Sequence, residues 1–169
     1  MILTKEKIKN EIEANNILIN PYDPHSLGSA SYDLSIGSTF RIFENNIKGF
    51  DITENSNYKD ITRPVEVKEY YLLQPNELVL GVTREEIQLP GNIAGILTGR
   101  SRFARVGLEV HITASLVQPG VKNRQVMEIK NAGTIPLKIH IGTRLMQIIF
   151  VRCEGSSVYK GIYRNQKKV

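Results

Sequence analysis

The chain has 169 residues, a length typical of one domain. Its 41% hydrophobic and 23% charged residues are enough to build a core and argue against a disordered chain. No apolar run approaches the roughly 20 residues that cross a bilayer, and the charged N-terminus lacks the apolar segment of a secretory signal. The single cysteine, Cys153, excludes an intramolecular disulfide and a Cys-rich metal cluster, so we expect a cytoplasmic protein without a membrane partner.

Charge is distributed unevenly along the chain. Residues 1–94 carry 9 basic and 14 acidic side chains, residues 95–152 carry 9 and 2, and residues 153–169 carry 4 and 1. The basic second half is expected to meet an anion, either a nucleic acid or a small polyphosphate. A plain solvated basic surface is the alternative.

Residues 4–15 have the pattern of a helix, because Thr4 is a capping residue and Ile8 and Ile12 lie four positions apart. Polar residues at 44–62 predict a long exposed loop. Short β-rich runs, each ended by Gly, Pro or Asn, predict strands at 31–36, 39–43, 66–73, 77–83, 93–97, 108–114, 124–130, 136–141 and 144–152. The expected fold is all-β with a short N-terminal helix, arranged as an antiparallel sandwich or barrel.

Several common catalytic motifs are missing from the sequence. It has no phosphate-binding GxxxxGK[ST] loop, no GxGxxG and no GxSxG. The three histidines, His25, His111 and His140, do not have HExxH spacing, and one cysteine cannot supply the PCxxC half of a zinc deaminase site. A catalytic zinc site is therefore not expected.

A basic turn follows the predicted strand at 93–97. Gly99 begins it, and Arg100, Arg102 and Arg105 follow with Ser101 between them. A glycine turn can expose backbone N–H groups to an anion, and arginine binds phosphate through two parallel hydrogen bonds. The turn is therefore a candidate anion site, and a basic surface loop is the alternative.

Glu128 is an acidic residue within an alternating, basic segment. A carboxylate that faces a pocket lined by Arg100 or Arg105 would be a candidate general acid or base. A structural ion pair is the alternative.

The stretch GRSRFARVGLEVHITASLVQPG at 99–120, followed by MEIKN, resembles the central signature of the dCTP deaminases, GRSSxARxGLxxHxTAxxxDPG followed by LExxN. The resemblance extends to SYDLSIG at 31–37, LPGNIAGILTGR at 89–100, GTRLMQIIF at 142–150 and YKGIYRNQ at 159–166. It spans nearly the whole chain except the loop at 44–62.

The resemblance implies the distorted, jelly-roll-like β-barrel that dCTP deaminases share with trimeric dUTPases. It further implies a single domain over 1–169, a homotrimer with active sites between subunits, and a C-terminal tail, 153–169, that closes over the nucleotide. Mg²⁺ would arrive with the triphosphate.

The resemblance also implies roles for individual residues. Glu128 would move protons between water, the ring nitrogen and the leaving ammonia, and partial burial would help it to take a proton near neutral pH. Ser101 and the carbonyl of Ala114 would hold the attacking water, and Arg105 would support this catalytic group. Asp33 would support the metal-bound phosphates indirectly. The implied substrate-binding residues are Arg100, Arg102, His111, Thr113, Gln118, Gln147, Tyr159, Tyr163 and Gln166.

The sequence departs from the family pattern at Arg102, Gln118, Asn123 and Ile162, where the pattern has serine, aspartate, glycine and lysine. Gln118 matters most, because dUTPases carry at that position an aspartate that activates or orients the hydrolytic water, and glutamine cannot act as a base. The other departures could weaken triphosphate binding unless Arg102 compensates.

The leading interpretation is therefore zinc-independent hydrolysis of dCTP to dUTP and ammonia. A dUTP diphosphatase, or a bifunctional enzyme that also forms dUMP and pyrophosphate, is the first alternative. A catalytically impaired protein that binds dCTP, dUTP or dTTP is the second. A nucleic-acid-binding barrel is the last, and we expect no nucleic-acid partner because aromatic residues are scarce among the basic ones.

Overall fold

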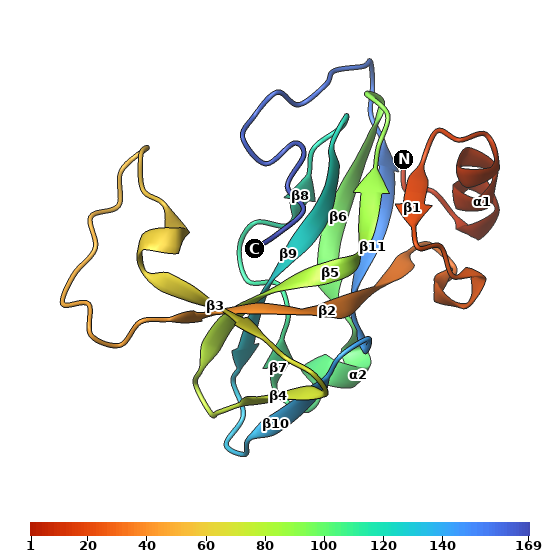
Figure 1. Ribbon diagram of the computed structural model, residues 1–169. Helices are drawn as coiled ribbons and strands as arrows, with labels where there is room; N and C mark the ends of the chain where they lie inside the picture. Colours follow the sequence, from red (N-terminus) through yellow and green to blue (C-terminus); the bar gives the residue numbers. More distant parts are fainter.

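The computed structural model describes residues 1–169, which fold around a strongly curled antiparallel sheet of nine strands (Figure 1). The strand order is β7-β9-β5-β2-β11-β6-β8, with β1 paired to β5 and β3 paired to β2, and β10 and β4 form a separate two-stranded sheet. The strands are β1 (Leu18–Asn20), β2 (Tyr32–Phe43), β3 (Thr62–Glu66), β4 (Tyr70–Leu73), β5 (Leu78–Gln88), β6 (Ile93–Gly99), β7 (Leu108–Glu109), β8 (Leu116–Val117), β9 (Lys122–Asn131), β10 (Leu137–His140) and β11 (Arg144–Arg152). The helices are α1 (Lys5–Glu13) and α2 (Ser101–Ala104), with 3₁₀ turns at Pro24–Ser26 and Tyr58–Asp60.

The hydrophobic core lies inside the curl and consists of one cluster of 26 buried residues. Strand β9 shows how the sequence builds it, because alternate side chains such as Met127 and Ile129 are fully buried. Glu128 lies between them and therefore points to the opposite face of the sheet. The alternation expected at 124–130 is thus confirmed, and it sends the candidate acid-base group away from the core.

The prediction of an all-β fold with a short N-terminal helix is confirmed. Helix α1 begins after Thr4, whose side chain makes no capping hydrogen bond, and it buries Ile8 completely. Glu11 near its C-terminal end forms a salt bridge with Arg152 on β11. No helix of the fold combines the length and the apolar composition that crossing a membrane requires.

Several predicted strand boundaries are wrong. The runs at 31–36 and 39–43 form the single strand β2, in which Gly37 allows close approach because a Cβ there would lie 2.9 Å from the Val82 carbonyl oxygen. The run at 66–73 is broken between β3 and β4. The strand expected at 108–114 ends at Glu109, and the short strands β1 and β8 were not predicted. Strands of two or three residues, such as β8 and β1, are too short to show the alternation of apolar and polar residues from which a strand is predicted.

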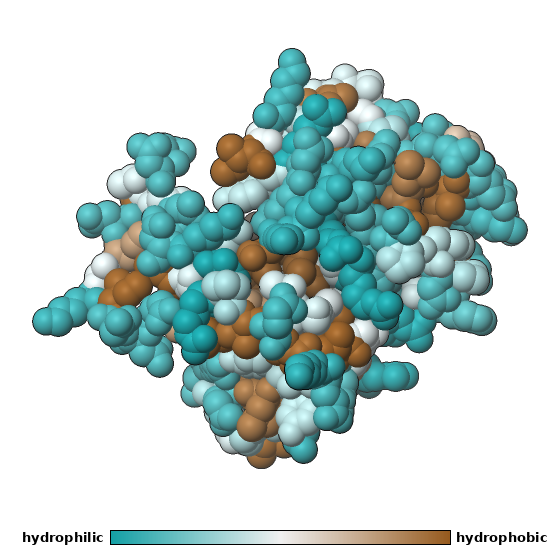
Figure 2. Space-filling model, viewed as in Figure 1, coloured by the Kyte–Doolittle hydropathy of each residue, from teal (hydrophilic) through white to brown (hydrophobic).

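The tail at 153–169 returns across the molecule to lie beside the first part of β9. The backbone N–H groups of Lys122 and Arg124 donate to the carbonyls of Arg164 and Gln166 at 2.9 and 2.8 Å. The last side chain, Val169, is buried. Figure 2 shows apolar side chains between polar ones in the middle of this face.

Gly107 fixes the join between α2 and β7. Its φ is +81°, and a Cβ would lie 2.9 Å from the backbone nitrogen of Gly133. Its carbonyl also accepts the N–H of Ala132 at 2.8 Å. Both the left-handed backbone and the close approach require glycine.

We therefore expect Gly107→Ala to lower the free energy of unfolding by about 1–3 kcal/mol, measured by urea denaturation. Gly49→Ala is the control, because Gly49 lies in open space. Equal stability of the two variants would contradict this account of the α2–β7 join.

Candidate active site

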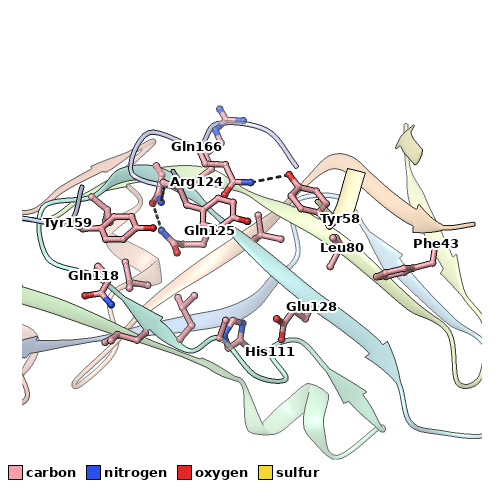
Figure 3. Close-up of a pocket in the computed structure, with 18 residues that line it drawn as sticks. Phe43, Tyr58, Leu80, His111, Gln118, Arg124, Gln125, Glu128, Tyr159 and Gln166 are labelled. Carbon is pink, nitrogen blue, oxygen red and sulfur yellow. Dashed lines mark hydrogen bonds between the residues drawn. The ribbon is translucent and has the colours of Figure 1, made fainter. Parts of the chain in front are cut away.

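A pocket of about 520 Å³ opens between β9, the segment around β8 and the tail (Figure 3). Its wall is largely apolar, with Leu97, Val117 and Val121 among its lining residues, and several polar groups converge on it. This combination is typical of a small-molecule site. The residues of the expected site that line it are His111, Ala114, Gln118, Glu128, Tyr159, Tyr163 and Gln166.

The carboxylate of Glu128 is held by the loop that follows β7. Its Oε2 atom accepts the backbone N–H groups of Ile112 at 2.8 Å and Thr113 at 2.7 Å. The Thr113 hydroxyl donates to Oε1 at 3.1 Å. Thr113 therefore orients the carboxylate rather than lining the pocket. These bonds also explain why the strand expected at 108–114 stops early, because the loop bends to present its N–H groups to Glu128.

Partial burial raises the pKa of Glu128, but the hydrogen bonds from Thr113 and Ile112 and the nearby His111 outweigh it, so the pKa lies below its usual value. The expectation that burial would bring this group close to neutral titration is therefore wrong for the chain as folded. Glu128 is ionised at neutral pH, because three donors stabilise its charged form.

His111 lies beside Glu128 at the same end of the pocket (Figure 3). Both of its ring nitrogens are buried and neither has a hydrogen-bond partner. Buried polar atoms without partners are uncommon and costly. The imidazole can therefore donate or accept a hydrogen bond when a polar ligand enters, which is compatible with the expected substrate-binding role.

A second group of expected site residues lies around α2 and is separate from the pocket. Arg100 forms a salt bridge with Asp33 at 2.9 Å and donates to the Arg144 carbonyl at 2.6 Å. Gln147 accepts the Ser31 hydroxyl at 3.0 Å and donates to the Gly99 carbonyl at 3.2 Å. This group joins the basic turn at 99–105 to β2 and β11.

Asp33 is largely buried in this second group. Burial raises its pKa, and the nearby Arg100 and Arg144 oppose that shift only in part. The chain has no set of three or more His, Cys, Asp or Glu side chains placed to hold a metal ion. Asp33, with its carboxylate bound to Arg100, fits a supporting role toward phosphates better than direct coordination of a cation.

Within one chain, the basic turn and the pocket do not form a single site. Ser101, Arg102 and Arg105 are exposed, make no side-chain hydrogen bond, and do not line the pocket. The expectation of a Glu128 pocket lined by Arg100 or Arg105 is therefore wrong for a single copy of the chain. The turn does contain the short helical segment α2, with its arginines on the surface.

Some pocket residues were missed by sequence analysis. Tyr58 and Phe43 lie in or next to the 44–62 loop, which carries no motif. Asn123 and Gln125 line the pocket although each is only 7% exposed. One feature of the sequence pointed to Asn123, because this residue stands where the family pattern has glycine.

A family model described as dCTP deaminase-like matches residues 2–153. A relative from Nocardioides sp., named "dCTP deaminase, dUMP-forming", is 36% identical over 176 aligned positions and covers 99% of this chain and 92% of its own length. A relative of the same name from Persephonella marina is 32% identical, with coverage of 99% and 93%.

Solved structures show the same fold. The 2'-deoxycytidine 5'-triphosphate deaminase from Agrobacterium tumefaciens aligns with a TM-score of 0.70 at 19% identity over 88% of this chain, which spans about half (47%) of that protein's length. The EIAV dUTPase aligns with a TM-score of 0.54 at 15% identity, covering 86% of this chain and 95% of its own. These alignments confirm the expected dUTPase-like fold.

The lowered pKa of Glu128 predicts a pH-dependent contribution to stability. An ionised carboxylate that is stabilised in the folded state contributes above its unfolded pKa, about 4.3, and the contribution is lost as pH falls through the lower folded pKa. Glu128→Gln should therefore be less stable than the wild type at pH 7, and the difference should shrink in acid.

Urea denaturation at neutral and acidic pH measures this difference. Glu109→Gln is the matched control, because Glu109 is exposed and makes no side-chain hydrogen bond or salt bridge. A gap between wild type and Glu128→Gln that stays constant with pH would show that the hydrogen bonds do not favour the ionised form.

Proposed function

Because this chain belongs to the dCTP deaminase-like family, we propose that it hydrolyses the amino group of dCTP, with Glu128 as the group that moves protons. The observation that carries the proposal is the ionised Glu128 carboxylate, held by three donors at the end of a largely apolar pocket. The largely apolar wall of the pocket suits the faces of a flat base. His111 and the Glu128 carboxylate can form hydrogen bonds with the polar edge of that base.

An ionised carboxylate is the form required by the first step, which takes a proton from the attacking water. Water adds to C4 of the cytosine ring while Glu128 transfers the proton to the ring nitrogen. Glu128 then takes the proton of the new C4 hydroxyl and gives it to the amino group, so that the C4–N bond breaks, ammonia leaves and a C4 carbonyl remains. The sequence lacks the ligand motifs of zinc deaminases, so we assign activation of water to Glu128 itself.

Ala114 lines the pocket beside the loop that holds Glu128, in keeping with a role for its carbonyl in binding the attacking water. Ser101 and Arg105 have no part in the pocket of their own chain. We propose that a neighbouring copy brings its basic turn to this pocket, in a homotrimer whose sites lie between subunits. Exposed apolar side chains support such packing, since Val106, Ile112 and Leu116 are 56%, 45% and 56% exposed.

The triphosphate would meet Arg100, Arg102 and Gln147 of the basic turn and its neighbours, with Asp33 holding Arg100 in place. Mg²⁺ would be bound by the phosphate oxygens and would neutralise part of their charge. The tail would contribute Tyr159, Tyr163 and Gln166 over the sugar and phosphates, since all three already line the pocket.

Two products remain to be distinguished. Release of dUTP is the first candidate. Hydrolysis of the phosphate chain needs a carboxylate that acts as a base, and the residue that lines the pocket at that position of the family pattern is Gln118, which cannot do so. Formation of dUMP is the second, and the names of the relatives favour it.

Incubation with dCTP and Mg²⁺, followed by assays of ammonia and pyrophosphate, tests both the reaction and its product. We expect ammonia from the wild type and at least a hundredfold less from Glu128→Gln, because removal of a general acid-base group typically costs about 10²–10⁴-fold. Binding of dCTP to the variant should change little.

Ammonia without pyrophosphate supports dUTP as the product, and equal amounts support dUMP. Wild-type turnover in Glu128→Gln would overturn the role of this residue. Tight nucleotide binding with neither product would instead support the catalytically impaired alternative.

A mixing experiment tests whether the site is shared. Ser101→Ala and Glu128→Gln are each expected to be inactive, but trimers assembled from equal amounts of both should regain about a quarter of the wild-type sites. In such a trimer an intact Ser101 of one copy can face an intact Glu128 of the next.

The variants are co-expressed or refolded together, and ammonia release is compared with that of each variant alone. A mixture that stays as inactive as its components would show that Ser101 and Glu128 act within one chain or in different sites.

A further inference from the structure

The tail is docked on β9 by its backbone. Besides the bonds from the Lys122 and Arg124 N–H groups to the tail carbonyls, the Tyr159 N–H donates to the Pro119 carbonyl at 2.9 Å. Backbone bonds of this kind fix a segment without regard to its side chains. Side-chain contacts therefore help to set the register of the tail on β9, and two of these contacts come from side chains outside the tail.

Asn123 supplies one such anchor. Its side-chain amide donates to the Tyr163 carbonyl at 2.7 Å, and its Oδ1 atom accepts the Gln125 side chain at 2.6 Å. The Gln125 N–H in turn donates to the buried Thr83 hydroxyl at 2.9 Å. Because the Tyr163 carbonyl can only accept, the Asn123 NH₂ group faces the tail, and its oxygen is left to accept the Gln125 side chain.

Tyr58, which also lines the pocket, supplies the second anchor and lies next to Gln166 (Figure 3). Its hydroxyl accepts the Gln166 side chain at 3.4 Å. The ring lies 5.5 Å from the guanidinium of the buried Arg41, which donates to the Thr62 hydroxyl at 2.7 Å. The Thr62 hydroxyl donates to the Tyr58 carbonyl at 2.7 Å. The otherwise unpatterned 44–62 loop is thereby fixed where it meets the tail.

The Ile162 side chain does not hold the tail in place, because it is 86% exposed. We propose that Asn123 and Tyr58 are positioning residues that clamp the tail over the pocket before nucleotide binds. This role rests on the proposed deamination of dCTP. The clamp holds the tail side chains Tyr163 and Gln166 in position before dCTP arrives, so less conformational entropy is lost when it binds.

Hydrogen exchange in the nucleotide-free enzyme tests the clamp without any activity. The amides of Lys122 and Arg124 should be protected as long as the tail stays docked, because both donate to tail carbonyls. Asn123→Ala should speed their exchange about fivefold and Tyr58→Phe about twofold, the effect expected for loss of one hydrogen bond of about 1 or 0.5 kcal/mol. Asn10→Ala on the exposed face of α1 should have no effect.

Steady-state kinetics give the second readout. Each variant should raise KM for dCTP by the same factor as its exchange effect and leave kcat within about twofold, as expected for lost binding rather than lost chemistry. Unchanged exchange at the Met127 and Ile129 amides shows that the sheet is intact, and Tyr58→Phe serves as the test if Asn123→Ala does not fold.

Unprotected Lys122 and Arg124 amides in the wild type would overturn the clamp, as would variants that leave them unchanged. Loss of kcat at constant KM would overturn the positioning role. An enzyme that releases no ammonia but shows the predicted exchange would refute the proposed function alone.

Discussion

The structure depends on the hydrogen bonds between Glu128 and the loop at 112–113. A carboxylate on the outer face of β9 would ordinarily point into solvent, where it would have no defined orientation. Here two backbone N–H groups and one hydroxyl converge on it. The same bonds end β7 after two residues and place His111 and Ala114 at the end of the pocket. One interaction therefore shapes the loop, orients the carboxylate and keeps it ionised.

The expected site residues are divided between two places in the chain. The pocket contains the carboxylate, the unpartnered imidazole and the tail, but none of the three arginines of the basic turn. The turn exposes Arg102 and Arg105, whereas Arg100 is partly buried in its salt bridge with Asp33. In the proposed homotrimer, this turn would bring its positively charged side chains to the pocket of a neighbouring copy.

Sequence patterns predicted the parts of the fold that depend on local spacing. The alternation around Met127 and Ile129 gave β9 and the direction of Glu128, and the spacing of Ile8 and Ile12 gave the helix. The loop after β7 could not be predicted from periodicity, because it is bent by bonds to a residue about fifteen positions away. Docking of the tail on β9 and the entry of Tyr58 into the pocket depend on similarly distant contacts. The family motifs located most of the candidate site, but not its distribution between two surfaces.

A crystal structure of the Glu128→Gln variant with dCTP and Mg²⁺ would test the central claim most directly. We expect the cytosine ring in the pocket beside His111, its C4 facing residue 128, and the triphosphate against the basic turn of a neighbouring copy. A nucleotide bound elsewhere, or a side chain at 128 directed away from the ring, would contradict it.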